Sequence, residues 1–322
     1  GLPRIVALLD GEYSPRSLLD LTLCLKALTA NKMHHPNLLT QFVQAGGPKK
    51  LVKLVSTGDK DVSQAALQII RSLADAEGPR KALIKENALP PLLRCLRPSM
   101  PQAAVEPASA ALSVFTLHES ECCQAVLNAQ GIPSLTQLLS RGADSLAAHS
   151  AASCLAHLCT NDEVGTEARK RARDAGALEA LLPLLDGVLA GNGSQAATAE
   201  AACVALAELC RGSSAIAAEM RTLGALQSVV GLLSAPSAPP NLRVAACEVI
   251  GACAASDSAS LAELRRLGAV PLLAGLITGG TKAVAEKAQS VLSLLQQRGD
   301  SDMAGEVAGA MAAASDEGAP HL

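Results

Sequence analysis

A short stretch near the middle of the chain recurs along the sequence at a nearly constant interval. Residues 131–139 read GIPSLTQLL, a turn-forming glycine followed by a short helix with its leucines on one face. Near-copies begin at Gly176, Gly224 and Gly268, at intervals of 45, 48 and 44 residues, and another opens the chain at Gly1. A helical repeat of this period predicts an α-solenoid, in which each unit packs only on its neighbours. We therefore expect function to lie on surfaces rather than in a catalytic centre.

Each repeat also contains a longer segment with a broad stripe of apolar and small residues. After the turn at residues 57–59 the stripe has the helical spacing i, i+3, i+4, i+7, i+8 and i+11. The same spacing recurs 85, 136 and 180 residues later. The four stripes are Val62/Ala65/Ala66/Ile69/Ile70/Leu73, Ala147/Ser150/Ala151/Cys154/Leu155/Leu158, Thr198/Ala201/Ala202/Ala205/Leu206/Leu209 and Leu242/Ala245/Ala246/Val249/Ile250/Cys253. We expect this face of every long helix to be buried against neighbouring helices.

Between each long helix and the next opening stretch lies a shorter polar helix. We expect such helices over residues 79–86, 121–129 and 167–175, so that each unit is a triplet of helices. About seven units, the first incomplete, predict an all-α fold, a right-handed α–α superhelix over residues 1–297. Residues 298–322 are Ala-rich, and we expect them to form a terminal cap or a weakly ordered tail.

Some segments depart from the regular pattern. The long helix of the third unit, with Ala111, Val114 and Phe115, fits two registers one residue apart, and both remain open. Insertions at residues 186–194 and 235–240 lengthen two units, and we expect both to be solvent-exposed loops. The chain opens midway through a unit and without an initiator Met, so we expect further residues upstream.

Composition and charge argue against several classes of protein. Hydrophobic residues make up 49% of the chain but aromatic residues only 1%, so the core must be built from small and aliphatic side chains. The formal net charge of −3 gives no general attraction for nucleic acid or for an anionic membrane. No run reaches the roughly 20 apolar residues that span a bilayer, and no secretory signal opens the chain. We expect a cytoplasmic protein.

Several of the ten cysteines recur at equivalent positions of the long helices. Cys203 and Cys247 each lie six residues before the last stripe position of their helices, and Cys24 and Cys154 each lie four residues before theirs. Free cysteine commonly behaves as a small buried hydrophobe. Since the sequence has no Cys-x-x-Cys pair, we predict core cysteines and no metal site.

The triplet of helices, the opening Gly-x-Pro-x-Leu-x-x-Leu-Leu and the long helix with Ala-Ala-x-x-Leu-x-x-Leu together resemble the armadillo repeat family. The resemblance covers residues 1 to about 297. It implies a solenoid whose third helices line a concave surface for partner proteins. The family includes nuclear-import adaptors, adhesion and signalling scaffolds, substrate arms of ubiquitin ligases and ciliary structural proteins, so the resemblance indicates protein binding.

On this resemblance, two rows of residues on the exposed face of the long helices are candidates for partner binding. The rows are Leu23, Gln68, Ser153, Val204, Glu248 and Ser290, and beside them Ala27, Ser72, His157, Glu208, Ala252 and Leu294. Glu200, one turn before Val204, joins Glu208 and Glu248 in an expected acidic patch. Import adaptors carry ladders of Trp and Asn at these rows, and this sequence has neither. We therefore expect no binding of nuclear-import signals.

A second candidate for partner binding is the densest basic run of the chain. It holds Arg169, Lys170, Arg171 and Arg173. The run is either the solvated face of a connecting helix or a docking patch for an acidic partner, such as a tubulin tail or nucleic acid. Glu163, Glu167 and Asp174 dilute its charge, and no aromatic residues are interleaved for base stacking. We therefore do not expect nucleic acid as a partner.

No stretch of the sequence matches a catalytic or cofactor-binding motif. The segment 279–282, Gly-Gly-Thr-Lys, lacks the residue order of a phosphate-binding loop and follows a helix, which favours a turn. The Ser, His and Asp residues are scattered over repeating helices without a nucleophile elbow. We expect no catalysis, no cofactor and no small-molecule substrate.

We interpret the chain as a non-catalytic protein–protein interaction scaffold, a structural or adaptor subunit of a larger intracellular assembly. The missing import ladder and the mixed charge of the candidate face favour this interpretation. The Ala- and Gly-rich composition suggests a ciliary or axonemal assembly, with tubulin or axonemal components as partners. The alternative is the substrate-recognition arm of a ubiquitin ligase whose U-box-type adaptor domain lies upstream.

Overall fold

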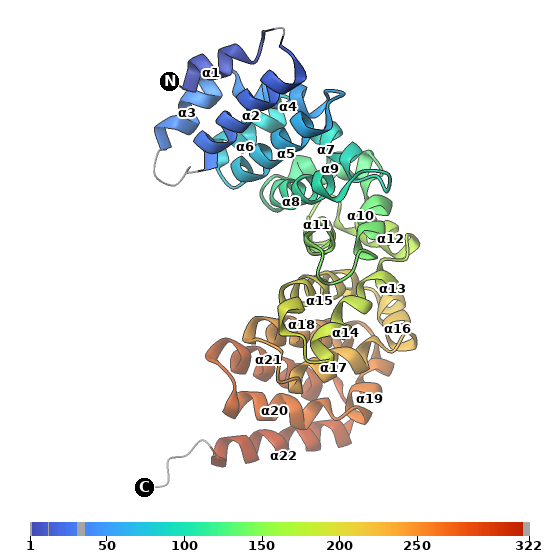
Figure 1. Cartoon of the computed structure of the whole chain (residues 1–322). Helices are drawn as coiled ribbons and strands as arrows, with labels where there is room; N and C mark the ends of the chain where they lie inside the picture. Colours follow the sequence, from blue (N-terminus) through green and yellow to red (C-terminus); the bar gives the residue numbers. More distant parts are fainter. Residues whose placement is uncertain (1, 12, 31–35, 318–322) are drawn as a thin grey trace. The chain divides into compact units, whose positions relative to one another are not determined.

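Helices account for all the regular structure that can be described. The computed structural model describes residues 2–11, 13–30 and 36–317, and no strand occurs among them. The helices form two compact units, Gly1–Leu138 and Leu139–Leu322, each with its own packed interior (Figure 1). The predicted all-α repeat fold is confirmed.

The helices follow one another in triplets, as the sequence predicts. The first helices are α3 (Pro36–Gln44), α6 (Glu77–Lys85), α9 (Ser120–Asn128), α12 (Gly165–Asp174), α16 (Ser214–Thr222) and α19 (Ser258–Arg266). The second helices are α1 (Leu2–Leu8), α4 (Gly47–Val55), α7 (Leu89–Cys95), α10 (Gly131–Leu139), α13 (Ala177–Leu181) with α14 (Pro183–Leu189), α17 (Ala225–Ser234) and α20 (Ala269–Gly279). Pro183 divides one second helix into α13 and α14, because proline lacks the N–H that a continuous helix needs.

The third helices are long and carry the buried stripes. They are α2 (Pro15–Ala30), α5 (Lys60–Ala74), α8 (Gln102–His118), α11 (Leu146–Thr160), α15 (Ala196–Cys210), α18 (Pro240–Ser256) and α21 (Lys282–Arg298). Every stripe position predicted in α5, α11, α15 and α18 is buried. In one unit α5 packs along α2 and α8, and in the other α15 packs along α11 and α18, and α18 along α21. The stripes therefore form the interior of each unit.

The turn before a second helix contains a residue in the left-handed backbone conformation. Gly176, Gly224 and Gly268 have φ of 75°, 73° and 70°, a region that glycine enters without strain. Before α10 this conformation belongs to Gln130, with φ of 53°, and Gly131 is already the first residue of the helix. The predicted equivalence of Gly131 with Gly176 is therefore wrong by one residue. Gly131 avoids a clash instead, since a Cβ there would lie 2.8 Å from Val126 Cγ1.

Burial distinguishes between the two registers that were open for the third unit. In α8, Ala111 and Phe115 are buried, whereas Val114 is half-buried. This pattern places Ala104 where α5 has Val62, a shift of 42 residues. All six stripe positions of α8 are then buried, including Pro107 inside the helix.

The stripe of α2 lies one residue later than the sequence suggests. Its buried residues are Thr22, Leu25 and Thr29. Cys24 and Leu28, both expected in the core, are exposed, while the other nine cysteines are buried. The expected row positions Leu23 and Ala27 are wrong for the same reason, and the rows reach Cys24 and Leu28 instead. The alternation of leucines on all sides of α2 makes its pattern degenerate.

The two insertions are less exposed than predicted. Residues 186–189 continue α14, and Val188 is buried. In the second insertion Ala235 and Ala238 are buried, and Ser237 Oγ donates a hydrogen bond of 2.6 Å to the carbonyl of Val188. Residues 189–194 are exposed as predicted, but the prediction is wrong for residues 186–188 and 235–238, because the insertions of consecutive triplets pack on each other.

Helix α22 (Ser301–Glu317) follows the seventh triplet. It packs on α20 and α21 and buries Met303 and Val307. Residues 301–317 therefore cover the last triplet as a terminal helix, whereas residues 318–322 lie outside the described part of the chain.

Apolar helices in the chain are short. No single helix of the described ranges is both long and apolar enough to cross a bilayer. Helices α16 and α17 meet the length and composition only when they are counted together across a bend of 77°.

Candidate functional site

The third helices of the unit Leu139–Leu322 share a face that the core does not use. Helix α15 packs against both α11 and α18 (Figure 1), so we treat the outward residues of the three helices as one surface. This surface holds six of the eight residues predicted on the concave face. They are Ser153, His157, Glu200, Val204, Glu208 and Glu248, all half-buried. We call this surface the third-helix face.

The carboxylates of the third-helix face differ in their partners. Glu208 accepts a hydrogen bond of 2.7 Å from Arg211, and Glu248 lies 2.8 Å from Lys287 Nζ. Glu200 has no ion-pair or hydrogen-bond partner among the described residues. Three carboxylates and two cations leave one net negative charge on this face. The acidic patch lies where the sequence places it, but two of its charges are neutralised.

The polar side chains of α11 are partly occupied by neighbouring backbone. Ser153 Oγ donates a hydrogen bond of 3.1 Å to the carbonyl of His149 on its own helix. The His149 ring in turn reaches α15, with Nδ1 3.2 Å from the carbonyl oxygen of Ala197. These hydrogen bonds fix the side chains of Ser153 and His149 at the α11 edge of the face. The side chains of α15 and α18 are the ones left to contact a partner.

Between α18 and α21 the third-helix face is hollowed into a groove of about 640 Å³. Small and aliphatic residues line its floor: Gly251, Ala252, Ala255, Val291 and Leu294. Polar residues line its rim: Arg211, Glu248, Lys287, Ser290, Ser293 and Gln297. A Cβ on Gly251 would lie 3.5 Å from Val291 Cγ2, so the glycine deepens the groove.

Two cations of the groove were missed by sequence reasoning. Lys287 lies one helical turn before Ser290, so the spacing of three residues could have placed it on the same face. Arg211 directly follows the last residue of α15, where a helix pattern carries no information. Both reach a carboxylate on a third helix, which the repeat pattern alone does not reveal.

The remaining two predicted face residues lie in the unit Gly1–Leu138, on α5. Gln68 is half-buried, and its Oε1 accepts a hydrogen bond from Lys26 Nζ of α2. Ser72 Oγ donates a hydrogen bond of 2.8 Å to the carbonyl of Ile69. The two predicted side chains of α5 are therefore uncharged and already hydrogen-bonded, and nothing marks them as a second binding site.

The predicted basic run lies on α12, where most of its charges have partners. Arg169 Nη1 donates a hydrogen bond of 2.6 Å to the carbonyl of Cys159 near the end of α11. Arg171 pairs at 2.7 Å with a glutamate of its own helix, and Arg173 at 2.6 Å with a glutamate of α16. Lys170 is exposed and has no ion pair within the described ranges. The contacts fit a solvated connecting helix better than a docking patch.

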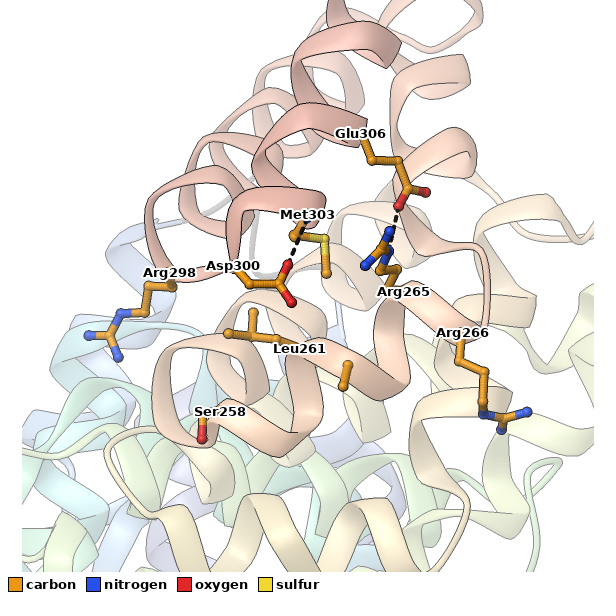
Figure 2. Close-up of a pocket in the computed structure, with 10 residues that line it drawn as sticks. Ser258, Leu261, Arg265, Arg266, Arg298, Asp300, Met303 and Glu306 are labelled. Carbon is orange, nitrogen blue, oxygen red and sulfur yellow. Dashed lines mark hydrogen bonds and ion pairs between the residues drawn. The ribbon is translucent and has the colours of Figure 1, made fainter.

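A second hollow, of about 700 Å³, lies between α19 and the start of α22 (Figure 2). Its arginines are engaged elsewhere. Arg265 pairs with Glu306 at 2.9 Å, and Arg298 donates a hydrogen bond of 2.7 Å to the carbonyl of Ala255. Figure 2 shows Arg266 and Arg298 directed away from Met303 at the centre of the hollow. The hollow therefore presents no converging cations for an anion.

Metal-ligand clusters are also absent from the part of the chain that can be described. No group of three or more His, Cys, Asp or Glu residues there could hold a metal ion. For most of the buried thiols burial raises the pKa, to about 12 for Cys122, Cys159 and Cys247. Such thiols are protonated at neutral pH and poor ligands.

The chain is similar to armadillo repeat proteins in sequence and in structure. Residues 76–115, which span α6, α7 and most of α8, match the family model described as Armadillo/beta-catenin-like repeat. No curated protein sequence matches the chain. An engineered protein of known crystal structure has a TM-score of 0.78 at 23% identity, over 93% of this chain and 69% of that chain.

Two further structures carry the family name. A designed armadillo repeat protein has a TM-score of 0.66 at 24% identity, over 77% of this chain and 99% of its own. Another, solved in complex with peptide (KR)4, has a TM-score of 0.65 at 22% identity, over 77% of this chain and 98% of its own. At these identities the likeness shows the fold.

Proposed function

We propose that the chain is a non-catalytic scaffold that holds an extended segment of a partner protein. The proposal follows from its armadillo-repeat solenoid fold. The observation that carries the proposal is the third-helix face with its groove between α18 and α21. The six predicted side chains of this face are half-buried and take no part in the buried stripes. A recessed floor of small residues between polar rims suits the backbone and side chains of an extended peptide.

The charges of the face favour a segment that carries a basic residue. Glu200 is the one carboxylate of the three without an ion-pair partner in the described ranges, so a cation opposite it gains an attraction that no internal pair competes for. One designed armadillo repeat protein of this fold was solved with the peptide (KR)4. Since this chain has no Trp, we expect it to bind such a peptide through charge alone and therefore weakly.

The role within an assembly is the finer part of the proposal. A ciliary or axonemal assembly with tubulin among its partners, and a cytoplasmic location, rest on the sequence alone and stay predictions. The same holds for the substrate arm of a U-box-type ubiquitin ligase. Each requires that the third-helix face hold a partner segment, so that binding step is the one to test first.

A labelled (KR)4 peptide, followed by fluorescence anisotropy at low salt, tests the binding step. We expect Glu200→Lys to weaken binding about fivefold, because it turns an attraction of an exposed charge pair into a repulsion. Glu179→Lys is the matched control, since Glu179 is exposed on α13, outside the third-helix face.

The control variant should bind the peptide as the unchanged chain does. An equal loss in both variants would mean that the peptide responds only to net charge, and the proposed site would then be wrong. Raising the salt concentration should lower the peptide affinity of the unchanged chain toward that of the Glu200→Lys variant, because screening removes the same attraction.

A further inference from the structure

Two cysteines of consecutive triplets approach each other in the unit Leu139–Leu322. Cys210 is the last residue of α15, and Cys253 lies in the last turns of α18. Their sulfur atoms are 3.5 Å apart, and both side chains are buried. A disulfide needs a sulfur separation of about 2.05 Å, so the two atoms must move together by roughly 1.5 Å. Because Cys210 ends its helix, the chain can make this adjustment without breaking a helical turn.

The surroundings of this pair leave one side open to the surface. Arg211 and Gly212, which follow Cys210, are exposed, and Gly212 has a φ of 72° that marks a turn. Ser256 Oγ donates a hydrogen bond of 3.1 Å to the carbonyl of Cys210 and accepts one from the Gly212 amide at 3.2 Å. These two hydrogen bonds join the turn after Cys210 to the end of α18, beside the pair of thiols.

The pKa of the Cys210 thiol is shifted in the opposite direction to those of Cys203 and Cys247. The hydrogen bond with the Cys253 thiol lowers the pKa of Cys210 against the opposing effect of burial, and Ser256 and Arg211 lower it further. Burial raises the pKa of Cys203 and Cys247, which occupy equivalent positions earlier in the same two helices. The thiolate is the reactive form of cysteine, so reactivity is concentrated at one sulfur of the close pair.

We propose that Cys210 and Cys253 form a reversible dithiol–disulfide pair that a peroxide oxidises. The Cys210 thiolate attacks one peroxide oxygen and the O–O bond breaks, which gives a sulfenic acid on Cys210. The leaving hydroxide takes up the proton that the Cys210 thiol lost and departs as water. The Cys253 sulfur then attacks the sulfenic sulfur, forming the S–S bond and releasing a second water. In total, two thiols and one hydrogen peroxide give one disulfide and two waters, and a dithiol reductant reverses the change.

The bond would fasten the end of α15 to α18 beside the groove. Arg211 and Gly212, the residues next to Cys210, line that groove together with Ser256. Oxidation therefore restrains one rim of the candidate binding surface. The chemistry itself does not depend on the proposed function, since it needs only the two thiols and the turn between them.

The test exposes the folded chain of 322 residues, with Cys24→Ser, to hydrogen peroxide and maps its disulfides by mass spectrometry without reduction. The exposed Cys24 is replaced because it would cross-link separate molecules. We expect a loss of two hydrogens and a peptide pair joined through Cys210 and Cys253. The melting temperature should rise by about 5 °C, because the cross-link restricts the unfolded chain.

Matched variants separate this pair from other buried thiols. Cys210→Ser and Cys253→Ser should each abolish the cross-linked peptide pair, while Cys203→Ser and Cys247→Ser should leave it unchanged. The disulfide map of the chain that keeps both Cys210 and Cys253 needs no substitution in the core. It therefore tests the proposal even if a core serine variant fails to fold. Free Cys210 and Cys253, under conditions that oxidise Cys24 in the original chain, would overturn the proposal. A disulfide that joins other cysteines would overturn it equally.

Discussion

Helices α5 and α15 hold the same place in their triplets, and their buried stripes differ in side-chain size at one position. Both bury all six stripe positions. The difference is Ile69 in α5 against Ala205 in α15, while the other five positions carry identical residues or residues of nearly equal volume. Helix α15 packs more extensively along α11 and α18 than α5 does along α2 and α8. The spacing of the pattern determines which face is buried, and the size of the side chains determines how closely the helices approach.

This difference also affects the candidate site. Close packing of α11, α15 and α18 brings their outward residues into one surface, on which His157, Glu208 and Glu248 are half-buried. The α5 face carries Gln68 and Ser72, whose polar groups are bonded within the unit. The small residue at position 205 thus lies beneath the surface that we propose as the binding site.

The largest effect should come from removing a large core residue of α5. Ile69→Ala is expected to lower the free energy of unfolding by about 2–5 kcal/mol, because a cavity remains where the side chain packed. Leu206→Ala, in α15, should cost a similar amount because α15 holds a large residue at that position. Denaturant unfolding of both variants measures this. A loss below about 1 kcal/mol in either would show that its helix is not close-packed.

The reverse exchange in α15 should have a smaller effect. Ala205, equivalent to Ile69, is fully buried, and Ala205→Ile adds three carbon atoms to a close helix contact. We expect a loss of about 1–3 kcal/mol from overpacking, measured by the same unfolding method. An unchanged stability would contradict the view that small residues set the helix spacing of this unit.

The helix N-termini provide the smallest effect in the comparison. Asp59 and Ser145 precede α5 and α11 with the same backbone angles, φ −85° and ψ 122°. The Asp59 carboxylate accepts hydrogen bonds from the amides of Asp61 and Val62, so Asp59→Ala should cost about 0.5–2 kcal/mol.

Ser145→Ala is the matched control for this capping prediction. Ser145 Oγ is buried and has no hydrogen-bond partner within the described ranges. Removing it should leave the melting temperature unchanged or slightly raised, because an unsatisfied buried hydroxyl is lost. Equal losses in the two variants would mean that capping does not distinguish them.

The sequence predicts the fold well because the repeats provide independent copies of one pattern. Each stripe in α5, α11, α15 and α18 is correct to the residue. The pattern fails in α2, where leucines occur on every side and no spacing is unique. It also misplaces the turn at Gln130, because the adjacent Gly131 suggests the wrong residue for the left-handed conformation.

The candidate site is less predictable than the fold, since side-chain partners depend on contacts between triplets. The rows correctly place Val204 and Glu208 on a partly exposed face. They do not reveal that Arg211 and Lys287 neutralise two carboxylates. Nor do they show that Arg169 donates a hydrogen bond to the carbonyl of Cys159 near the end of α11. Charge reversal there would disturb the fold, so Lys170→Glu alone is the clean probe of the basic run.

The central claim is that the third-helix face of the unit Leu139–Leu322 holds an extended partner segment. A photoreactive residue at Ser290, exposed on the groove rim, should cross-link labelled (KR)4 peptide on illumination. The same residue at Thr166, exposed on the first helix α12, should not. Cross-linking from Ser290 alone is the predicted result. Equal cross-linking from both positions, or cross-linking from Thr166 alone, would contradict the account.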